Sequence, residues 1–133
     1  SRGLGDVYKR QDIHKEYLEV SGEVIDMIET TKSLGKRVFA VGTTAARALE
    51  TAYIDETKKG FKGYTRLFIY PGYKFKAVDK LITNFHLPKS SLLMLVSAFI
   101  GHENMKEIYK TAVSKKYRFL SYGDAMLLNR NEI

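Results

Sequence analysis

The stretch Arg37–Ala52 reads RVFAVGTTAARALETA, and it decides the fold class of this chain. Its opening run, Arg37–Val41, is short, apolar and contains β-branched residues, as is typical of a strand buried on both faces. The alanine-rich run Ala45–Ala52 strongly favours a helix. Gly42–Thr44 lie between them. The pattern therefore predicts a strand, a tight turn and a helix, which is the basic unit of an α/β protein.

Comparable patterns on both sides of this unit predict further strands and helices. Besides 37–41, we expect strands at 13–20, 65–70, 78–85 and 117–122, helices at 21–34, 45–52, 90–100 and around 105–116, and a surface loop at 55–63. Strands that alternate with helices imply a largely parallel sheet with flanking helices. Ligands bind such sheets at the carboxyl ends of the strands, so we expect one rim to hold Gly42–Thr44, Tyr70–Gly72, Asn84–Pro88 and Tyr122–Asp124.

The composition limits the class of protein. The 133 residues are 44% hydrophobic and 28% charged, which suits one folded domain and disfavours disordered, collagen-like and coiled-coil chains. Because the sequence has no cysteine, it excludes a disulfide scaffold, a cysteine-ligated metal site and a thiol nucleophile. No apolar run approaches the roughly 20 residues that cross a bilayer, and no signal peptide is recognisable. We therefore expect a soluble, cytoplasmic protein.

The first residues differ in pattern from the rest of the chain. We interpret residues 1–11 as a leader, a linker or a non-native segment, and residues 12–133 as the α/β domain. Three basic residues and one acidic residue lie in residues 1–11, so +5 of the formal net charge of +7 belongs to the remainder. This surplus favours an anionic partner, although lysine-rich solvated faces also occur in proteins that bind nothing anionic.

The turn at Gly42–Thr44 is the first candidate binding site. Its backbone N–H groups and hydroxyls meet the start of a helix, where an anion or a polar ligand binds readily. The threonines either cap the helix or contact a ligand. Arg47, one turn into the helix, either reaches an acidic group of the ligand or is an ordinary solvated arginine.

The segment Thr83–Pro88 is the most concentrated polar stretch of the sequence. Asn84 supplies both a donor and an acceptor, and His86 is the side chain most easily adjusted for proton transfer near neutral pH. A lone loop histidine also has a purely structural interpretation. The other two histidines show no metal-ligand spacing to His86, so we expect no metal site.

Aromatic and basic residues alternate between residues 64 and 76. The aromatic residues are Tyr64, Phe68, Tyr70, Tyr73 and Phe75, and the cations are Arg66, Lys74 and Lys76. Nucleobases could stack on such rings while the cations contact phosphates. The alternative is that half or more of these rings belong to the hydrophobic core.

Six blocks of sequence, taken in order, resemble one known family. The blocks are His14–Tyr17, Val41–Thr44 with Arg47 and Leu49–Glu50, Phe68–Tyr73 with Phe75–Lys76, Thr83–Pro88, Met94–Phe99, and Tyr117–Phe119 with Ser121–Met126. They resemble the S-adenosylmethionine:tRNA ribosyltransferase-isomerases of queuosine biosynthesis, over about residues 12–128. Members of that family are much longer, so the resemblance implies the C-terminal portion of a larger two-domain enzyme, with an incomplete sheet.

The resemblance also implies an activity. Such an enzyme uses S-adenosylmethionine as a ribosyl donor and modifies 7-aminomethyl-7-deazaguanine in tRNA to epoxyqueuosine, with release of adenine and methionine. S-Adenosylmethionine is then a co-substrate, the macromolecular partner is tRNA, and neither a metal, a redox cofactor nor a membrane is involved. Because the rest of the enzyme would be missing, we expect this chain alone to be inactive or very weak.

The reaction needs a proton acceptor, polar groups around the donor and a cationic surface for tRNA. We assign proton transfer to His86 or His14 with Glu16, and the binding of a carboxylate or phosphate to Arg47. The other candidate binding residues are Gly42, Thr43, Thr44, Tyr70, Pro71, Gly72, Asn84 and Tyr122.

Two residues depart from the pattern of the family. Arg66 and Lys89 stand where acidic or polar residues are common, and both add positive charge near the proposed rim. The competing hypothesis is a non-catalytic RNA- or nucleotide-binding α/β module that keeps the Gly42–Thr44 turn and the cationic surface.

Overall fold

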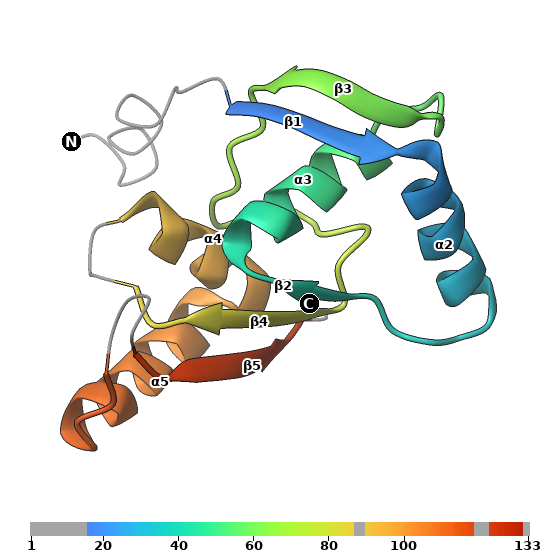
Figure 1. The fold of residues 1–133 in the computed structure, drawn as a ribbon. Coiled ribbons are helices and arrows are strands. Elements are labelled where there is room, and N and C mark those ends of the chain that lie inside the picture. Colours follow the sequence, from blue (N-terminus) through green and yellow to red (C-terminus); the bar gives the residue numbers. More distant parts are fainter. Residues whose placement is uncertain (1–15, 87–89, 119–122, 132–133) are drawn as a thin grey trace.

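Strands and helices alternate along much of the chain. The computed structural model describes residues 16–86, 90–118 and 123–131 (Figure 1). The elements are β1 (Glu16–Ser21), α2 (Gly22–Ser33), β2 (Phe39–Val41), α3 (Thr43–Tyr53), β3 (Gly60–Thr65), β4 (Lys80–Asn84), α4 (Ser91–Ile100), α5 (His102–Ser114) and β5 (Ala125–Asn129). The predicted strand, turn and helix at residues 37–52 are confirmed as β2 and α3. No helix among the described residues is long and apolar enough to cross a membrane.

The strands form two sheets, so the expectation of one largely parallel sheet is only partly confirmed. β1 and β3 make an antiparallel ribbon, with Tyr17 opposite Tyr64. In the second sheet, the order is β2-β4-β5; β2 runs parallel to β4, and β5 runs antiparallel to it.

The prediction of a loop at 55–63 followed by a strand at 65–70 is wrong. β3 occupies Gly60–Thr65, and the chain from Arg66 to Tyr70 has no regular structure. The backbone of Leu67 hydrogen-bonds to side chains and not to a neighbouring strand. Its carbonyl oxygen accepts Arg47 Nε at 2.8 Å, and the N–H of Leu67 donates to Thr65 Oγ1 at 3.1 Å. Gly60 marks close strand packing, because a Cβ there would lie 2.7 Å from the carbonyl oxygen of Val20.

The last strand of the described residues lies beyond the predicted strand at 117–122, of which only Tyr117 and Arg118 are described. β5 begins at Ala125, whereas Tyr117 and Arg118 are not in a strand, and residues 119–122 lie outside the described part. The N–H of Tyr117 donates to the carbonyl oxygen of Ala112 and so closes α5. Asp124 hydrogen-bonds Arg118 through both its backbone N–H and its carboxylate, directly before β5 begins.

Helix α3 packs against both sheets, with the β1–β3 ribbon on one side and β2 and β4 on the other (Figure 1). Ala46 and Ala52 on this helix are fully buried, which lets the strands approach closely. The predicted apolar helix is confirmed as α4, whose Val96 and Phe99 are completely enclosed.

The outer face of the second sheet is bare among the described residues. The register places Val41, Ile82 and Leu127 in one row across β2, β4 and β5, and 70% of Val41 and 59% of Leu127 are exposed. On the opposite face Ala40, Leu81 and Leu128 are buried. The expectation that the 37–41 strand is buried on both faces is therefore wrong, because α3 covers only one face of β2.

Candidate functional site

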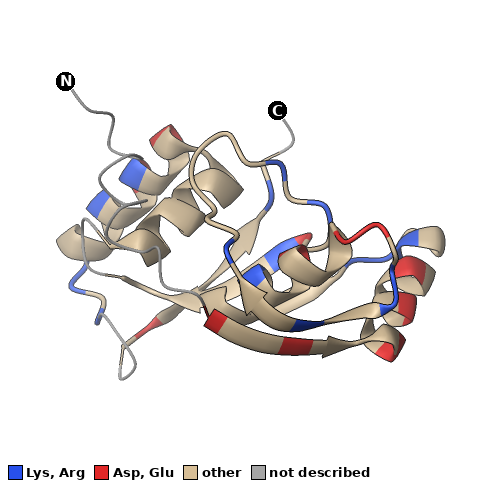
Figure 2. Cartoon of the chain, turned by 90° about the horizontal axis from the view of Figure 1, so that it is seen from above, with Lys and Arg blue, Asp and Glu red and all other residues tan. Residues whose placement is uncertain are grey.

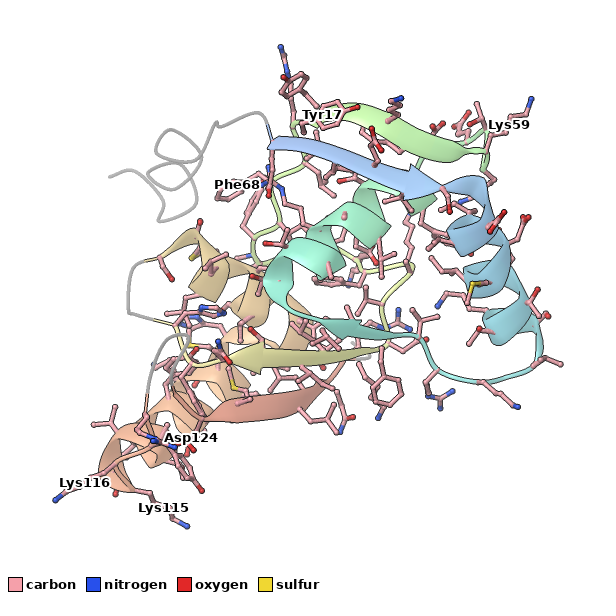
Figure 3. All side chains as sticks on the ribbon, in the orientation of Figure 1. Tyr17, Lys59, Phe68, Lys115, Lys116 and Asp124 are labelled. Atoms are coloured by element: carbon pink, nitrogen blue, oxygen red, sulfur yellow. The ribbon has the colours of Figure 1, made fainter. Side chains whose placement is uncertain are left out.

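A cavity of about 290 Å³ lies where α3 begins. Four parts of the chain meet there: the start of β1, the first turn of α3, the irregular connection after β3, and the start of α4. The lining residues are Glu16, Thr43, Thr44, Arg47, Leu67, Phe68, Ile69, Ser91, Leu92 and Leu95. Glu16, Thr43, Thr44 and Arg47 are all residues that the sequence predicts at the site. Figure 3 shows Phe68 beside the start of β1.

The start of α3 is open to a ligand. Gly42 has φ +96°, a backbone conformation that favours glycine, and its N–H is held by the carbonyl oxygen of Ile82 at 2.7 Å. The helix begins at Thr43, and no side chain in the described part of the chain caps it. The alternative in which a threonine caps the helix is therefore not seen, and the first-turn N–H groups and the helix dipole remain suited to a negatively charged group. The neighbouring helix α4 differs, because Ser90 Oγ accepts the N–H of Leu93 at 3.2 Å.

Arg47 is held firmly in the wall of the cavity. Its Nη1 lies 2.8 Å from Glu16 Oε2, and its Nε donates to the carbonyl oxygen of Leu67. Only 22% of the Arg47 side chain and 40% of the Glu16 side chain are exposed. Arg47 is thus not an ordinary solvated arginine. The pair presents a fixed cation and a carboxylate acceptor to the same space.

His86 lies in a different environment. Its Nε2 is 2.9 Å from Thr83 Oγ1, and its backbone N–H donates to the hydroxyl of Tyr109 at 3.0 Å. Burial lowers the pKa of His86, which keeps the imidazole neutral and able to accept a proton near pH 7. His86 does not line the cavity at Arg47, and neither does Asn84, which pairs with Ala125 at the end of β4. His14 and Tyr122 lie outside the described residues.

The predicted single rim is wrong for Tyr70–Gly72. Pro71 and Gly72 form the expected turn, but they line a second cavity of about 420 Å³, together with His102 and Arg130. The connection that contains them runs along α4, so residues 67–69 reach the first cavity and residues 71–75 reach the second. No strand carries Tyr70 to the edge where β2 and β4 end.

Sequence reasoning missed the role of Glu50. This glutamate is fully buried, and its carboxylate accepts the hydroxyl of Tyr73 and the N–H groups of Lys76, Ala77 and Val78 at 2.7–2.9 Å. Burial, and then the charge of Glu50, raise the pKa of the Tyr73 phenol. One signal was available: Glu50 stands four residues after Ala46 and so shares the buried face of an alanine-rich helix. Glu50 fixes the irregular connection against α3.

Asp79 is a second carboxylate with a structural role. It accepts the N–H of Val38 at 2.9 Å and pairs with Lys32 of α2 at 3.3 Å and with Arg130, beyond β5, at 3.4 Å. Asp79 thus links α2 to the residue before β2 and to the residue after β5. Within the described parts of the chain, no group of three histidine, aspartate or glutamate side chains could hold a metal ion.

The fold and the site define an α/β protein with a cavity at the start of a helix. The chain belongs to the queuosine biosynthesis protein family, whose model matches residues 5–128. This finding confirms the resemblance carried by the six ordered blocks of sequence.

The relatives are close in sequence but longer. The chain is 57% identical over 117 residues to the S-adenosylmethionine:tRNA ribosyltransferase-isomerase of Halothermothrix orenii, covering 87% of this chain and 34% of that protein. The protein of the same name from Vesicomyosocius okutanii is 54% identical over 126 residues, and the match covers 95% of this chain and 37% of that protein. The chain thus spans about a third of the length of these curated relatives.

A solved structure has the same fold. The S-adenosylmethionine tRNA ribosyltransferase of Thermotoga maritima matches with a TM-score of 0.81 and 50% sequence identity. The match covers 86% of this chain and 41% of that chain.

Proposed function

We propose that this chain forms part of a tRNA-modifying enzyme that transfers the ribosyl moiety of S-adenosylmethionine to 7-aminomethyl-7-deazaguanine in tRNA and isomerises it, giving epoxyqueuosine. The family and the names of the two close relatives support this proposal. S-Adenosylmethionine and tRNA are the substrates. The proposed enzyme acts in the cytoplasm and needs no resident metal or redox cofactor.

The observation that carries the proposal is the Arg47–Glu16 pair beside the uncapped start of α3. S-Adenosylmethionine offers a carboxylate, ribose hydroxyls and a flat adenine ring. Arg47 suits the carboxylate, the N–H and hydroxyl groups of Thr43 and Thr44 suit the ribose, and the apolar wall suits adenine. About 290 Å³ is at the lower end of ligand-pocket volumes, so we expect the cavity to hold only part of the donor.

The proposed chemistry begins with a proton acceptor. The sulfonium of S-adenosylmethionine acidifies the adjacent 5′ carbon, so removal of a proton there generates an ylide. Adenine then leaves, the amine of the tRNA base captures the sugar, and rearrangement expels methionine. Glu16 is the proposed acceptor that lines the cavity, while His86, neutral because of burial, and His14 are the competing candidates.

A chimera tests the proposal. The matched segment of the Halothermothrix orenii relative is replaced by the corresponding residues of this chain, and the chimera is incubated with S-adenosylmethionine and tRNA that carries 7-aminomethyl-7-deazaguanine. We expect release of adenine and methionine and formation of epoxyqueuosine. The chain alone should show little or no turnover.

The same chimera distinguishes the proposal from the non-catalytic alternative. Arg47→Ala in the chimera should abolish most turnover, whereas Lys115→Ala, an exposed cation beyond α5, should leave it unchanged. A folded chimera that binds RNA but neither binds nor consumes S-adenosylmethionine would instead support an RNA-binding module.

A further inference from the structure

Two tyrosines stand exposed on the outer face of the β1–β3 ribbon. Tyr17 and Tyr64 are opposite each other in the register, with ring centroids 5.3 Å apart in an edge-to-face arrangement. Exposure is 49% for Tyr17 and 64% for Tyr64, so most of both rings is open to solvent. Figure 3 shows Tyr17 on the side of the ribbon that faces away from α3. Neither ring therefore packs in the hydrophobic core.

Cations accompany the two rings. Lys62 lies on the same face of β3, 3.8 Å from Glu19, and Arg66 follows the strand and is exposed. In Figure 2, the basic segment of β3, Lys62, lies beside the acidic residues of β1. Glu19 also accepts the hydroxyl of Tyr17 at 2.8 Å, which fixes that ring.

Tyr64 and Arg66 also border a third cavity, of about 410 Å³. Its floor and walls include Phe61 from β3 and Ile54 from the end of α3. In the described residues β3 pairs only with β1, so the backbone groups of its other edge lack a strand partner. An aromatic ring, a guanidinium and a strand edge together suit a flat base and its phosphate.

This cavity is next to the candidate donor site. Leu67 lines both, and Glu16 of the donor site is opposite Thr65 in the ribbon, where Thr65 lines the third cavity. Glu16 and Thr65 point toward α3, whereas their neighbours Tyr17 and Tyr64 point to the outer face, so a group stacked on Tyr64 would lie across the ribbon from the Arg47–Glu16 pair.

We propose that the surface formed by Tyr17, Tyr64 and Arg66 binds an unpaired nucleotide of the RNA substrate. The proposal rests on the proposed function, because it is the RNA substrate of that reaction that would occupy the surface. The Tyr64 ring stacks on the base, Tyr17 packs edge-to-face against Tyr64, and Arg66 contacts the phosphate. This places single-stranded RNA on the outer face of the ribbon whose other face carries Glu16 of the donor cavity.

The test measures RNA binding by the 133-residue chain. The probes are a labelled, unmodified tRNA anticodon stem-loop and a blunt RNA duplex with the same number of phosphates, followed by fluorescence anisotropy at several salt concentrations. We expect Tyr64→Ala to weaken stem-loop binding by about five-fold or more without changing duplex binding, because stacking contributes about 1–3 kcal/mol per base. Tyr64→Phe keeps the ring and should restore binding.

The cation has its own matched control. Arg66→Gln should weaken binding and reduce the slope of log affinity against log salt by about 1, whereas Lys115→Gln should change neither. Figure 3 shows Lys115 at the opposite end of the molecule from Tyr17.

The possible outcomes separate this proposal from the proposed function. If Tyr64→Ala binds the stem-loop as the unaltered chain does, or if the unaltered chain binds loop and duplex equally or binds neither, the surface is not the RNA site, although the chimera can still turn over. If the chimera is inactive and the loop-specific effect of Tyr64 persists, the proposed reaction fails and the RNA site stands. Because Tyr64 is exposed, Tyr64→Ala should fold, and a thermal unfolding curve checks this.

Discussion

Arg47 and Glu16 meet between α3 and β1, with Nη1 2.8 Å from Oε2, and the Nε of the same guanidinium holds the carbonyl oxygen of Leu67. One side chain thus joins a helix, a strand and an irregular connection. The arrangement needs two donors in a fixed plane, which arginine has and lysine lacks.

Arg47→Lys should therefore weaken both stability and donor binding. We expect the free energy of unfolding to fall by about 1 kcal/mol, because one charge-assisted hydrogen bond is lost and the other is weakened. Urea unfolding of the chain and calorimetric titration of the chimera with S-adenosylmethionine measure the two effects. Ala48→Gly, on the same helix, should lower stability by a similar amount without changing donor affinity. Equal donor affinity in Arg47→Lys and the parent chimera would remove Arg47 from the site.

Glu50→Gln should destabilise the chain strongly. The carboxylate accepts four donors, whereas an amide offers one oxygen and two donor hydrogens, so at least one buried N–H loses its acceptor. We expect a loss of about 2 kcal/mol or more. Tyr73→Phe removes only one of the four hydrogen bonds and should lower stability by about 1 kcal/mol. If the two variants unfold at the same urea concentration as the parent, Glu50 does not hold the connection.

His86 should make stability depend on pH. Burial lowers its pKa in the folded state, so below the unfolded value of about 6.5 the unfolded chain binds more protons and stability falls as the pH falls. His86→Gln should flatten that part of the curve of melting temperature against pH. His102→Gln, an exposed histidine, is the control. Identical curves for His86→Gln and the parent between pH 5 and 7 would contradict the assignment.

The bare face of the second sheet predicts opposite results at two adjacent residues. Leu127→Lys places a charge in solvent, so we expect nearly unchanged stability, higher solubility and less binding of a hydrophobic dye. Leu128→Lys buries an unpaired charge and should prevent folding. Circular dichroism and dye fluorescence measure both. Unfolding of the Leu127→Lys chain would show that its side chain is needed inside.

The sequence predicts those elements that local residue type and spacing determine. The unit at residues 37–52 and helix α4 follow from residue type and spacing alone. β3 was missed because its glycines resemble a loop, and the structure uses Gly60 to let β1 approach. The register that exposes Val41 depends on which face the helices cover, and periodicity within a short apolar run does not contain that information.

The candidate site was predicted as single residues and not as an arrangement. Glu16 and Arg47 were both named, but they are 31 positions apart, and only the packing of α3 against β1 brings them together. The prediction places Pro71 and Gly72 at the same rim because it expects them to end a strand at 65–70, and that segment is not a strand. The buried role of Glu50 was missed because helix propensity does not say which face of a helix is enclosed.

From β1 to β4, the strands of the two sheets alternate along the sequence. β1 and β2 precede the largely exposed turn at residues 55–59, and their partners β3 and β4 follow it. Neither half of the chain can complete either sheet by itself. Two polypeptides separated at this turn should therefore each be unstructured alone and fold only when mixed, as circular dichroism would record, so folding of the divided chain should depend on the concentration of both parts.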